Sequence, residues 1–187
     1  DKVHPNAIGA GKMAAVWFNK LTEVLDKPSQ PFNPELVTYK STSGEELQLH
    51  IFKPAKSHGN GARPCIVFFF GGGWKVGTPV QFYREAAYFS SKGMVAITAD
   101  YRTEYENGSS VFESVSDAKS AVRWIRKNAA RYGIDPDRIV AAGASAGGHL
   151  AAAAATIADF DELGADTSIS SKPNLNLLYY PVIDNGP

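Results

Sequence analysis

The sequence predicts an α/β fold, in which a mostly parallel sheet carries helices on both faces. Four apolar runs of strand length alternate with helical segments; they span residues 64–70, 94–99, 138–142 and 174–180. Gly93 and Gly133 stand at the predicted ends of two helices, where glycine commonly stops a helix. Strands that alternate with helices form parallel sheets whose carboxyl ends share one edge.

The chain opens with a segment that we expect to lie apart from the sheet. Residues 1–13 are polar and turn-rich, residues 14–25 have the pattern of a short amphipathic helix, and the prolines of residues 27–34 end it. We therefore predict two parts, an N-terminal tail with its helix over residues 1–34 and an α/β domain over residues 35–187.

The predicted sheet begins with a hairpin and continues through two clear helices. Strands at residues 35–42 and 46–53 flank Ser43-Gly44, which is typical of a hairpin turn. A helix follows at residues 81–92. The next helix is the best supported, because apolar residues recur at alternating spacings of four and three; they are Val111, Val115, Ala118, Val122, Ile125 and Ala129.

One serine lies where a strand is expected to turn sharply into a helix. The sequence Gly143-Ala144-Ser145-Ala146-Gly147-Gly148 follows the strand at 138–142 and precedes an alanine-rich run at 150–155. This G-x-S-x-G pattern is typical of a nucleophile elbow, in which the serine hydroxyl projects from a strained turn. Bulky side chains at Gly143 and Gly147 would collide there. We predict Ser145 as a nucleophile, with helix amides pointing at a developing oxyanion.

Three consecutive glycines follow the apolar strand at 64–70. Gly71-Gly72-Gly73-Trp74 allows the backbone to approach a ligand closely and to turn its N–H groups inward. Such a loop, paired with a later serine elbow, is the oxyanion-hole arrangement of lipases and esterases, although a flexible turn is the alternative. We predict the backbone amides of Gly72, Gly73 and Ala146 as the oxyanion donors, and we expect a side chain at either loop glycine to block both turn and substrate.

These motifs, taken in order, resemble a family. Phe70-Gly71-Gly72-Gly73-Trp74 is similar to the H-G-G-G-[FW] loop of the hormone-sensitive-lipase-like esterases, and Asp100-Tyr101-Arg102 matches their D-Y-R. Residues 133–139 match the usual lead into the elbow strand. Ser145-Ala146-Gly147-Gly148-His149-Leu150 matches the bacterial feruloyl- and acetyl-esterase-like branch. The resemblance covers about residues 35–187.

The resemblance implies an α/β-hydrolase fold and a serine carboxylesterase that acts on short-chain, acetyl or feruloyl-type esters, small or polysaccharide-linked, without metal or cofactor. A serine peptidase of the same fold and a non-catalytic binding protein of this fold are the alternatives. One departure stands out, since Phe70 replaces the usual first histidine of the loop. That histidine supports the loop, so the change concerns the loop's hydrogen bonds rather than the class of reaction.

Composition agrees with a globular domain. The hydrophobic content of 44% and charged content of 20% are ordinary, and a formal net charge of zero gives no reason to expect nucleic acid as a partner. No apolar run approaches the roughly 18 residues of a membrane-spanning helix. The single cysteine, Cys65, lies in a buried strand and is expected to pack as a small hydrophobe. The compartment is not predicted.

A base and an acid are missing from the expected places. In this fold the chain order is serine, acid, histidine, yet the only histidine after Ser145 is His149, on the same predicted helix. Asp184 comes one strand too early for the family's acid. We therefore expect an incomplete domain that lacks its C-terminal strands and needs a further segment or a partner chain. Residues 1–187 alone should be inactive, with the last strand left as an exposed apolar edge.

Other residues receive structural interpretations. His149 is expected to form a structural hydrogen bond beneath the elbow, and Asp100 and Arg102 to form a buried ion pair or to anchor their loop. Trp74 and Tyr180 are candidates for the substrate pocket, with core packing as the alternative for both. An acidic group is expected to be a solvated loop rather than a metal site; it comprises Asp159, Asp161, Glu162 and Asp166.

Overall fold

A computed structural model describes residues 32–42, 44–55 and 61–183. Residues 33–187 belong to one compact unit. The predicted tail and amphipathic helix of residues 14–25 lie outside the described residues, as does Asp184. The division of the chain at residues 34 and 35 therefore stays a prediction.

Among the described residues, six strands form one mixed sheet in the order β1-β2-β4-β3-β5-β6. Their bounds are β1 Glu35–Thr42, β2 Glu45–Phe52, β3 Arg63–Phe69, β4 Val95–Ala99, β5 Ile134–Ala144 and β6 Leu175–Tyr179. The hairpin strands β1 and β2 are antiparallel, and β2 runs antiparallel to β4. From β4 to β6 the neighbours are parallel, which confirms the predicted fold class.

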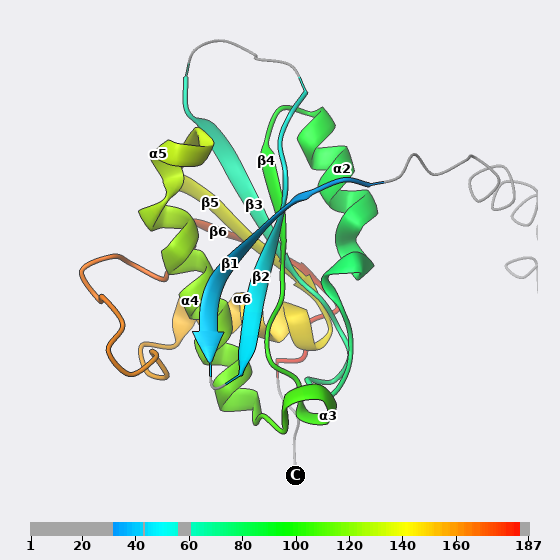
Figure 1. Cartoon of the computed structure of the whole chain (residues 1–187), viewed down its shortest axis with the longest axis vertical. Coiled ribbons are helices and arrows are strands. Elements are labelled where there is room, and N and C mark those ends of the chain that lie inside the picture. Colours follow the sequence, from blue (N-terminus) through cyan, green and yellow to red (C-terminus); the bar gives the residue numbers. More distant parts are fainter. Residues whose placement is uncertain (1–31, 43, 56–60, 184–187) are drawn as a thin grey trace, which may run out of the picture. The chain divides into compact units, whose positions relative to one another are not determined.

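Helices cover both faces of this sheet. Their bounds are η1 Pro79–Phe82, α2 Tyr83–Ser91, α3 Glu104–Asn107, α4 Val111–Lys127, α5 Ala129–Tyr132 and α6 Ala146–Thr156. Helix α2 lies on one face, against β4, whereas α4 and α6 pack against each other on the opposite face (Figure 1). Short α3 follows β4 and marks the end of the sheet where the parallel strands terminate (Figure 1).

Helix α4 follows its predicted periodicity but ends before the predicted point. It begins with a capping box, in which the Glu113 carboxylate accepts a hydrogen bond from the amide of Ser110. A capping box provides hydrogen-bond acceptors for amides that have no carbonyl partner within the helix. The helix stops at Lys127, and Asn128 separates it from α5. Gly133 then ends α5 in the left-handed conformation at φ 64°, as its position predicts.

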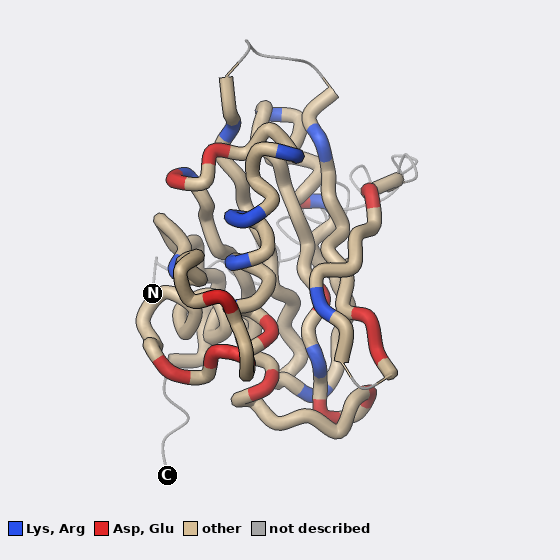
Figure 2. Tube along the Cα trace, turned by 60° about the vertical axis from the view of Figure 1, so that its left-hand side comes forward, with Lys and Arg blue, Asp and Glu red and all other residues tan. Residues whose placement is uncertain are grey.

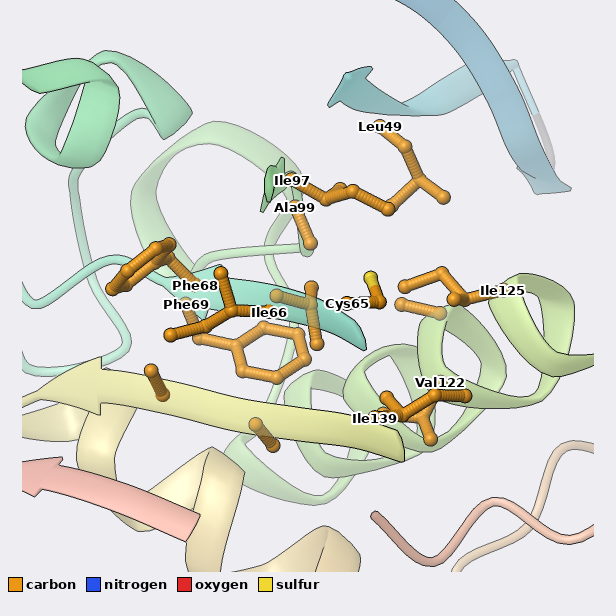
Figure 3. Packing of buried hydrophobic residues seen from close by; sticks show 14 of the residues in the cluster. Leu49, Cys65, Ile66, Phe68, Phe69, Ile97, Ala99, Val122, Ile125 and Ile139 are labelled. Carbon is orange, nitrogen blue, oxygen red and sulfur yellow. The ribbon is translucent and has the colours of Figure 1, made fainter. Parts of the chain in front are cut away.

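The core lies between the sheet and its helices. Val122 and Ile125 of α4 point toward Ile139 and Cys65 of the central strands (Figure 3). Strand β3 is buried over Cys65–Phe69 because helices cover both of its faces, which explains its unbroken apolar sequence. Burial also raises the pKa of the Cys65 thiol, so this cysteine packs as the small hydrophobe that was predicted.

Arg102 is anchored by α4 rather than by its neighbour Asp100. Its guanidinium donates two hydrogen bonds of 2.8 Å to Asp117, a fully buried carboxylate that also pairs with Lys40 of β1 at 2.8 Å. Asp100 instead accepts from the amide of Tyr101 at 3.0 Å. Within the described residues no ion pair joins Asp100 to Arg102, so the loop-anchor interpretation holds for Arg102 and the pairing of these two does not.

The acidic segment after α6 is tied to the fold more firmly than a solvated loop would be. Asp161 pairs with Lys119 at 3.1 Å and with Arg123 at 2.8 Å, and Glu162 pairs with Lys40 at 3.1 Å. The ammonium of Lys119 also donates to three backbone carbonyls just after α6. The expectation of a solvated loop is therefore wrong for Asp161, which pairs with cations of α4, and for Glu162, which pairs with a cation of β1.

Burial makes Asp100 a source of pH-dependent stability. Desolvation raises its pKa to about 6, so the folded state holds the proton more tightly than the unfolded chain. The free energy of unfolding should then fall as pH rises from about 4 to about 6, and the penalty should persist above that range. Asp100→Asn keeps an acceptor for the Tyr101 amide without the charge.

We expect Asp100→Asn to raise the free energy of unfolding of the full-length protein at pH 7.5 by about 1 kcal/mol, and to change it little at pH 4. Urea denaturation at the two pH values measures this. The exposed Asp137→Asn serves as the control with no expected gain. Destabilisation by Asp100→Asn at pH 7.5 would show that the carboxylate has a stabilising partner.

Candidate active site

Ser145 lies at the junction of β5 and α6 in a backbone conformation that serine rarely adopts. Its φ of 54° and ψ of −119° belong to a region that normally requires glycine. The residue is exposed, although the residues that follow it in α6 are buried. A strained, solvent-facing serine between a strand and a helix is the arrangement that the sequence predicts for a nucleophile elbow.

Close backbone contact explains the two glycines of the elbow. A Cβ at Gly143 would lie 2.4 Å from the carbonyl carbon of Gly147, and a Cβ at Gly147 would lie 2.0 Å from the carbonyl oxygen of Phe69. Real Cβ atoms do not approach backbone this closely. The elbow therefore presses against the end of β3, which brings Ser145 beside the loop that follows this strand.

The end of β6 holds the backbone of Ser145 on its other side. The amide of Ser145 donates to the carbonyl of Tyr179 at 3.0 Å, and its own carbonyl accepts from Val182 at 3.2 Å and from His149 at 3.0 Å. These bonds fix the peptide groups on both sides of the strained residue. They also explain how a residue in an unfavourable conformation can be held in one position.

The glycine loop after β3 forms a tight turn beside the elbow. The carbonyl of Gly72 accepts from the amides of Lys75 and Val76, and the φ values of Gly72 and Gly73 are 142° and 63°. In the part of the chain that the structure describes, the amides of Gly72 and Gly73 donate no hydrogen bond. Ala146 is the first residue of α6, so its amide has no carbonyl partner within the helix.

The two loop glycines differ in what surrounds them. A Cβ at Gly72 would lie 1.8 Å from the carbonyl oxygen of Val76, so a side chain there destroys the turn. A Cβ at Gly73 would meet no atom within 4 Å. A side chain would therefore block the turn by collision at Gly72, whereas at Gly73 the left-handed φ is what resists substitution, and the expected block of the substrate stays a prediction. A side chain at Gly73 would instead enter open space beside the loop.

Sequence reasoning missed most of the contacts that support this loop. The ring of Phe70 stacks on Tyr101 with centroids 4.0 Å apart, and the Tyr101 hydroxyl donates to the Phe70 carbonyl at 2.8 Å. Gln81 accepts from the amide of Gly71 at 2.6 Å. Stacking thus supports the loop at the position where the resembled family has histidine. Gln81 lies ten residues from Gly71, and no local pattern signals their contact.

A cavity of about 470 Å³ adjoins the loop. It is lined by Gly73, Trp74, Lys75, Glu104, Ser109, Ser110, Val111 and Phe112. Trp74 is partly buried, packs against the core and lines this cavity, and its assignment to a substrate pocket stays a prediction. Tyr180 instead follows β6 at φ 46° and is 92% exposed. Its assignment to a substrate pocket stays a prediction.

Acidic side chains gather at the same end of the sheet. Glu45, Asp100 and Glu106 contribute to a cavity of about 220 Å³ near the end of β4. Figure 2 shows acidic residues mainly toward the end where α3 lies in Figure 1. The local potential should therefore disfavour anionic ligands.

The described histidines do not form a catalytic pair with Ser145. His50 lies on β2 and shares a hydrogen bond with Tyr83 of α2. The ring of His149 packs edge-on against Trp74, with centroids 5.1 Å apart and planes at 88°. Burial lowers the pKa of both imidazoles, which favours the neutral form. His149 Nδ1 has no partner among the described residues, so the predicted hydrogen bond is absent at that atom and a ring contact replaces it.

Comparison with known proteins agrees with this geometry. The sequence profile of the family described as BD-FAE matches residues 49–184, which include the glycine loop and the elbow. The chain belongs to the BD-FAE family. Its sheet has the α/β-hydrolase fold, and it is similar to esterases of that fold. The described residues contain no helix that is long and apolar enough to cross a membrane.

Individual relatives of this BD-FAE chain are esterases. It is 30% identical over 157 residues to carboxylesterase NlhH of Mycobacterium tuberculosis, a match that covers 79% of this chain and 44% of that protein. Arylesterase of Saccharolobus solfataricus is 30% identical over 82% of this chain and 50% of its own length. The chain thus spans half or less of these curated relatives.

Solved structures extend the likeness to three dimensions. Esterase 2 of Thermogutta terrifontis, phosphoramylated by tabun, superposes on the BD-FAE chain with a TM-score of 0.80 at 43% identity. The match covers 86% of this chain and 61% of that protein. The matched part of the chain therefore corresponds to about three fifths of that solved esterase.

Proposed function

We propose that this protein is a serine carboxylesterase that hydrolyses uncharged esters of short acyl groups, with Ser145 as nucleophile. The observation that carries the proposal is the strained, exposed Ser145 held against a loop whose amides at Gly72 and Gly73 donate to no described group. Acetyl and other short-chain esters, free or attached to polysaccharide, are the proposed substrates, and feruloyl-type esters, whose acyl group is larger, are the alternative. No cofactor takes part in the reaction.

The proposed reaction proceeds in two steps. Ser145 Oγ attacks the ester carbonyl carbon, and its proton passes to a general base. The carbonyl oxygen gains negative charge, which the amides of Gly72, Gly73 and Ala146 stabilise. The C–O bond to the alcohol then breaks, and the alcohol leaves with the proton. In the second step water attacks the acyl-enzyme, releases the carboxylic acid and restores the serine.

Two features support a short, uncharged substrate. The cavity beside Gly73 and Trp74, about 470 Å³, is large enough for a small acyl or alcohol group. The acidic end of the sheet disfavours a carboxylate on the substrate. Among the structural neighbours, esterase 2 of Thermogutta terrifontis has been solved with propionate and with butyrate bound. These are short acids, in keeping with the proposed acyl size.

The base and the acid of the triad are proposed to come from outside the described residues. His149 is unsuitable because it lies on the helix that begins at Ser145 and its ring packs on Trp74. The additional elements would adjoin β6, an edge strand of the described sheet on which Leu175 is 62% exposed. A further segment of the protein or a partner chain would supply them.

A polypeptide of residues 1–187 should therefore show no ester turnover on its own and should aggregate through the apolar edge at β6. Adding back the missing elements should restore both solubility and activity. Size-exclusion chromatography and an ester assay test this. A monodisperse monomer with esterase turnover would contradict the proposal that base and acid lie elsewhere.

The substrate class is tested with the full-length protein and two chromogenic compounds, p-nitrophenyl acetate and an aminoacyl p-nitroanilide. A carboxylesterase should hydrolyse the acetate and leave the anilide intact. Faster hydrolysis of the anilide would indicate a peptidase of the same fold. Turnover of neither compound would indicate a binding protein that keeps the esterase architecture.

A further inference from the structure

The proposed oxyanion hole is assembled from two separate segments, and its geometry depends on how they are held together. Gly72 and Gly73 follow β3, whereas Ala146 opens α6 after β5. The paired strands keep these segments in register as far as Phe69 and Gly143. Gly71 still lies against the elbow, where a Cβ would be 2.9 Å from the carbonyl oxygen of Ala144, but a Cβ at Gly73 would meet no atom within 4 Å.

A side-chain contact rejoins the two segments after the backbone has separated. The indole of Trp74, the residue after Gly73, meets the imidazole of His149 in the first turns of α6. The rings lie edge to face, with centroids 5.1 Å apart and planes at 88°. This is a favourable aromatic geometry, which contributes about 0.5–1.5 kcal/mol beyond the burial of area in comparable pairs.

Both partners are held in place on their own segments. Trp74 has a φ of 60°, an uncommon conformation for a large residue, and its carbonyl accepts from the amide of Glu104 at 2.8 Å. The amide of His149 donates to the carbonyl of Ser145 itself at 3.0 Å. The contact therefore runs from the loop, through two rings, to the backbone of the proposed nucleophile.

The contact is one of ring packing rather than hydrogen bonding. Trp74 Nε1 and His149 Nδ1 are both buried, and neither has a hydrogen-bond partner in the part of the chain that the structure describes. An imidazole that uses its ring and not this nitrogen can be replaced by another flat ring. A substitution that removes the ring should not be tolerated in the same way.

We propose that His149 is a positioning residue, which through its ring contact with Trp74 sets the distance between the loop amides and the Ala146 amide of the oxyanion hole. This inference rests on the proposed esterase function. It assigns His149 a role in transition-state stabilisation without contact to substrate. The hole binds the oxyanion of the transition state more strongly than it binds the carbonyl oxygen of the intact ester. Losing the contact should therefore lower kcat and leave KM nearly unchanged.

The test compares His149→Ala with His149→Phe in the full-length protein, using p-nitrophenyl acetate. In His149→Ala the oxyanion hole should lose its fixed geometry, so kcat should fall about 10- to 100-fold. The KM of this variant should stay within about threefold of the KM of the unmodified protein. His149→Phe keeps a ring at the contact and should retain kcat within about threefold. Trp74→Ala should lower kcat as much as His149→Ala, but it should also raise KM, because Trp74 lines the proposed substrate cavity. The double substitution should lower kcat no more than the larger single loss, because both remove one contact.

A matched control exists elsewhere in the fold. His50 meets Tyr83 in a similar edge-to-face contact, with centroids 5.7 Å apart, between β2 and α2. His50→Ala should leave kcat unchanged, which separates a general loss of packing from a specific effect on the hole. Thermal unfolding of each variant verifies that the protein is folded under assay conditions.

The outcomes are distinguishable. Unchanged kcat in His149→Ala would overturn the inference while leaving the esterase proposal intact. A loss in His149→Phe as large as in His149→Ala would also overturn it, because the ring would then be insufficient. If the unmodified protein lacks ester turnover, or if turnover survives Ser145→Ala, the proposed function fails, and the inference fails with it.

Discussion

Ser145→Ala should reduce ester turnover of the full-length protein about 10⁴- to 10⁶-fold, to a level set by the oxyanion hole alone. The reason is that the proposed mechanism forms the covalent bond to the acyl carbon through the Ser145 hydroxyl. KM should change little, since the hydroxyl contributes little to binding of the intact ester. Initial rates at saturating concentrations of p-nitrophenyl acetate measure the residual turnover.

Two further variants make the Ser145 result specific. Ser145→Gly should be equally inactive but more stable than Ser145→Ala, because glycine adopts a φ of 54° with ψ of −119° without strain. Ser91→Ala alters an exposed serine whose hydroxyl only donates to the carbonyl of Tyr88, and it should retain full activity. Substantial turnover in either Ser145 variant would remove this residue from the mechanism.

Gly72→Val should lower kcat at least 10²- to 10³-fold, the loss that follows removal of one oxyanion donor in comparable sites. A Cβ at Gly72 would lie 1.8 Å from the carbonyl oxygen of Val76, so the loop must open and its amides must turn away. The variant is assayed with p-nitrophenyl acetate after circular dichroism has established that it is folded.

Gly73→Ala is the comparison that separates the collision expected at Gly72 from the general effect of a side chain in this loop. Its methyl group would enter open space, and the only resistance is the left-handed φ of 63°, about 1 kcal/mol for alanine. The protein should therefore fold, and activity should fall less than in Gly72→Val. Gly164→Ala, in a left-handed surface turn with open surroundings, should be fully active. Normal turnover by folded Gly72→Val would show that the loop is only structural.

Local patterns predicted the framework because each depends on neighbouring residues. Alternating strands and helices gave the fold class, and the apolar spacing of residues 111–129 located α4. The elbow glycines were predictable because Gly143 and Gly147 flank Ser145 in the sequence, although the close contact of Gly147 is with the carbonyl of Phe69 on β3. Gly133 ended its helix where a left-handed residue was required.

Contacts between distant residues were not predictable in this way. Arg102 pairs with Asp117 of α4, although Asp100 is nearer in sequence, because the loop after β4 lies against that helix. Trp74 and His149 each belong to a recognisable motif, yet no periodicity signals that the two motifs touch. Such contacts depend on how the helices, strands and loops pack against one another, and no local sequence pattern indicates that packing.

The central claim, that Ser145 is the nucleophile of an ester hydrolase, is tested most directly by covalent labelling. The full-length protein is treated with a serine-directed fluorophosphonate, digested, and examined by mass spectrometry. We predict one adduct, on the peptide that contains Ser145. This adduct should form at the same rate at which ester turnover is lost, and Ser145→Ala should form none. An adduct on another residue that accompanies the loss of turnover, or loss of turnover without an adduct on Ser145, would contradict this account.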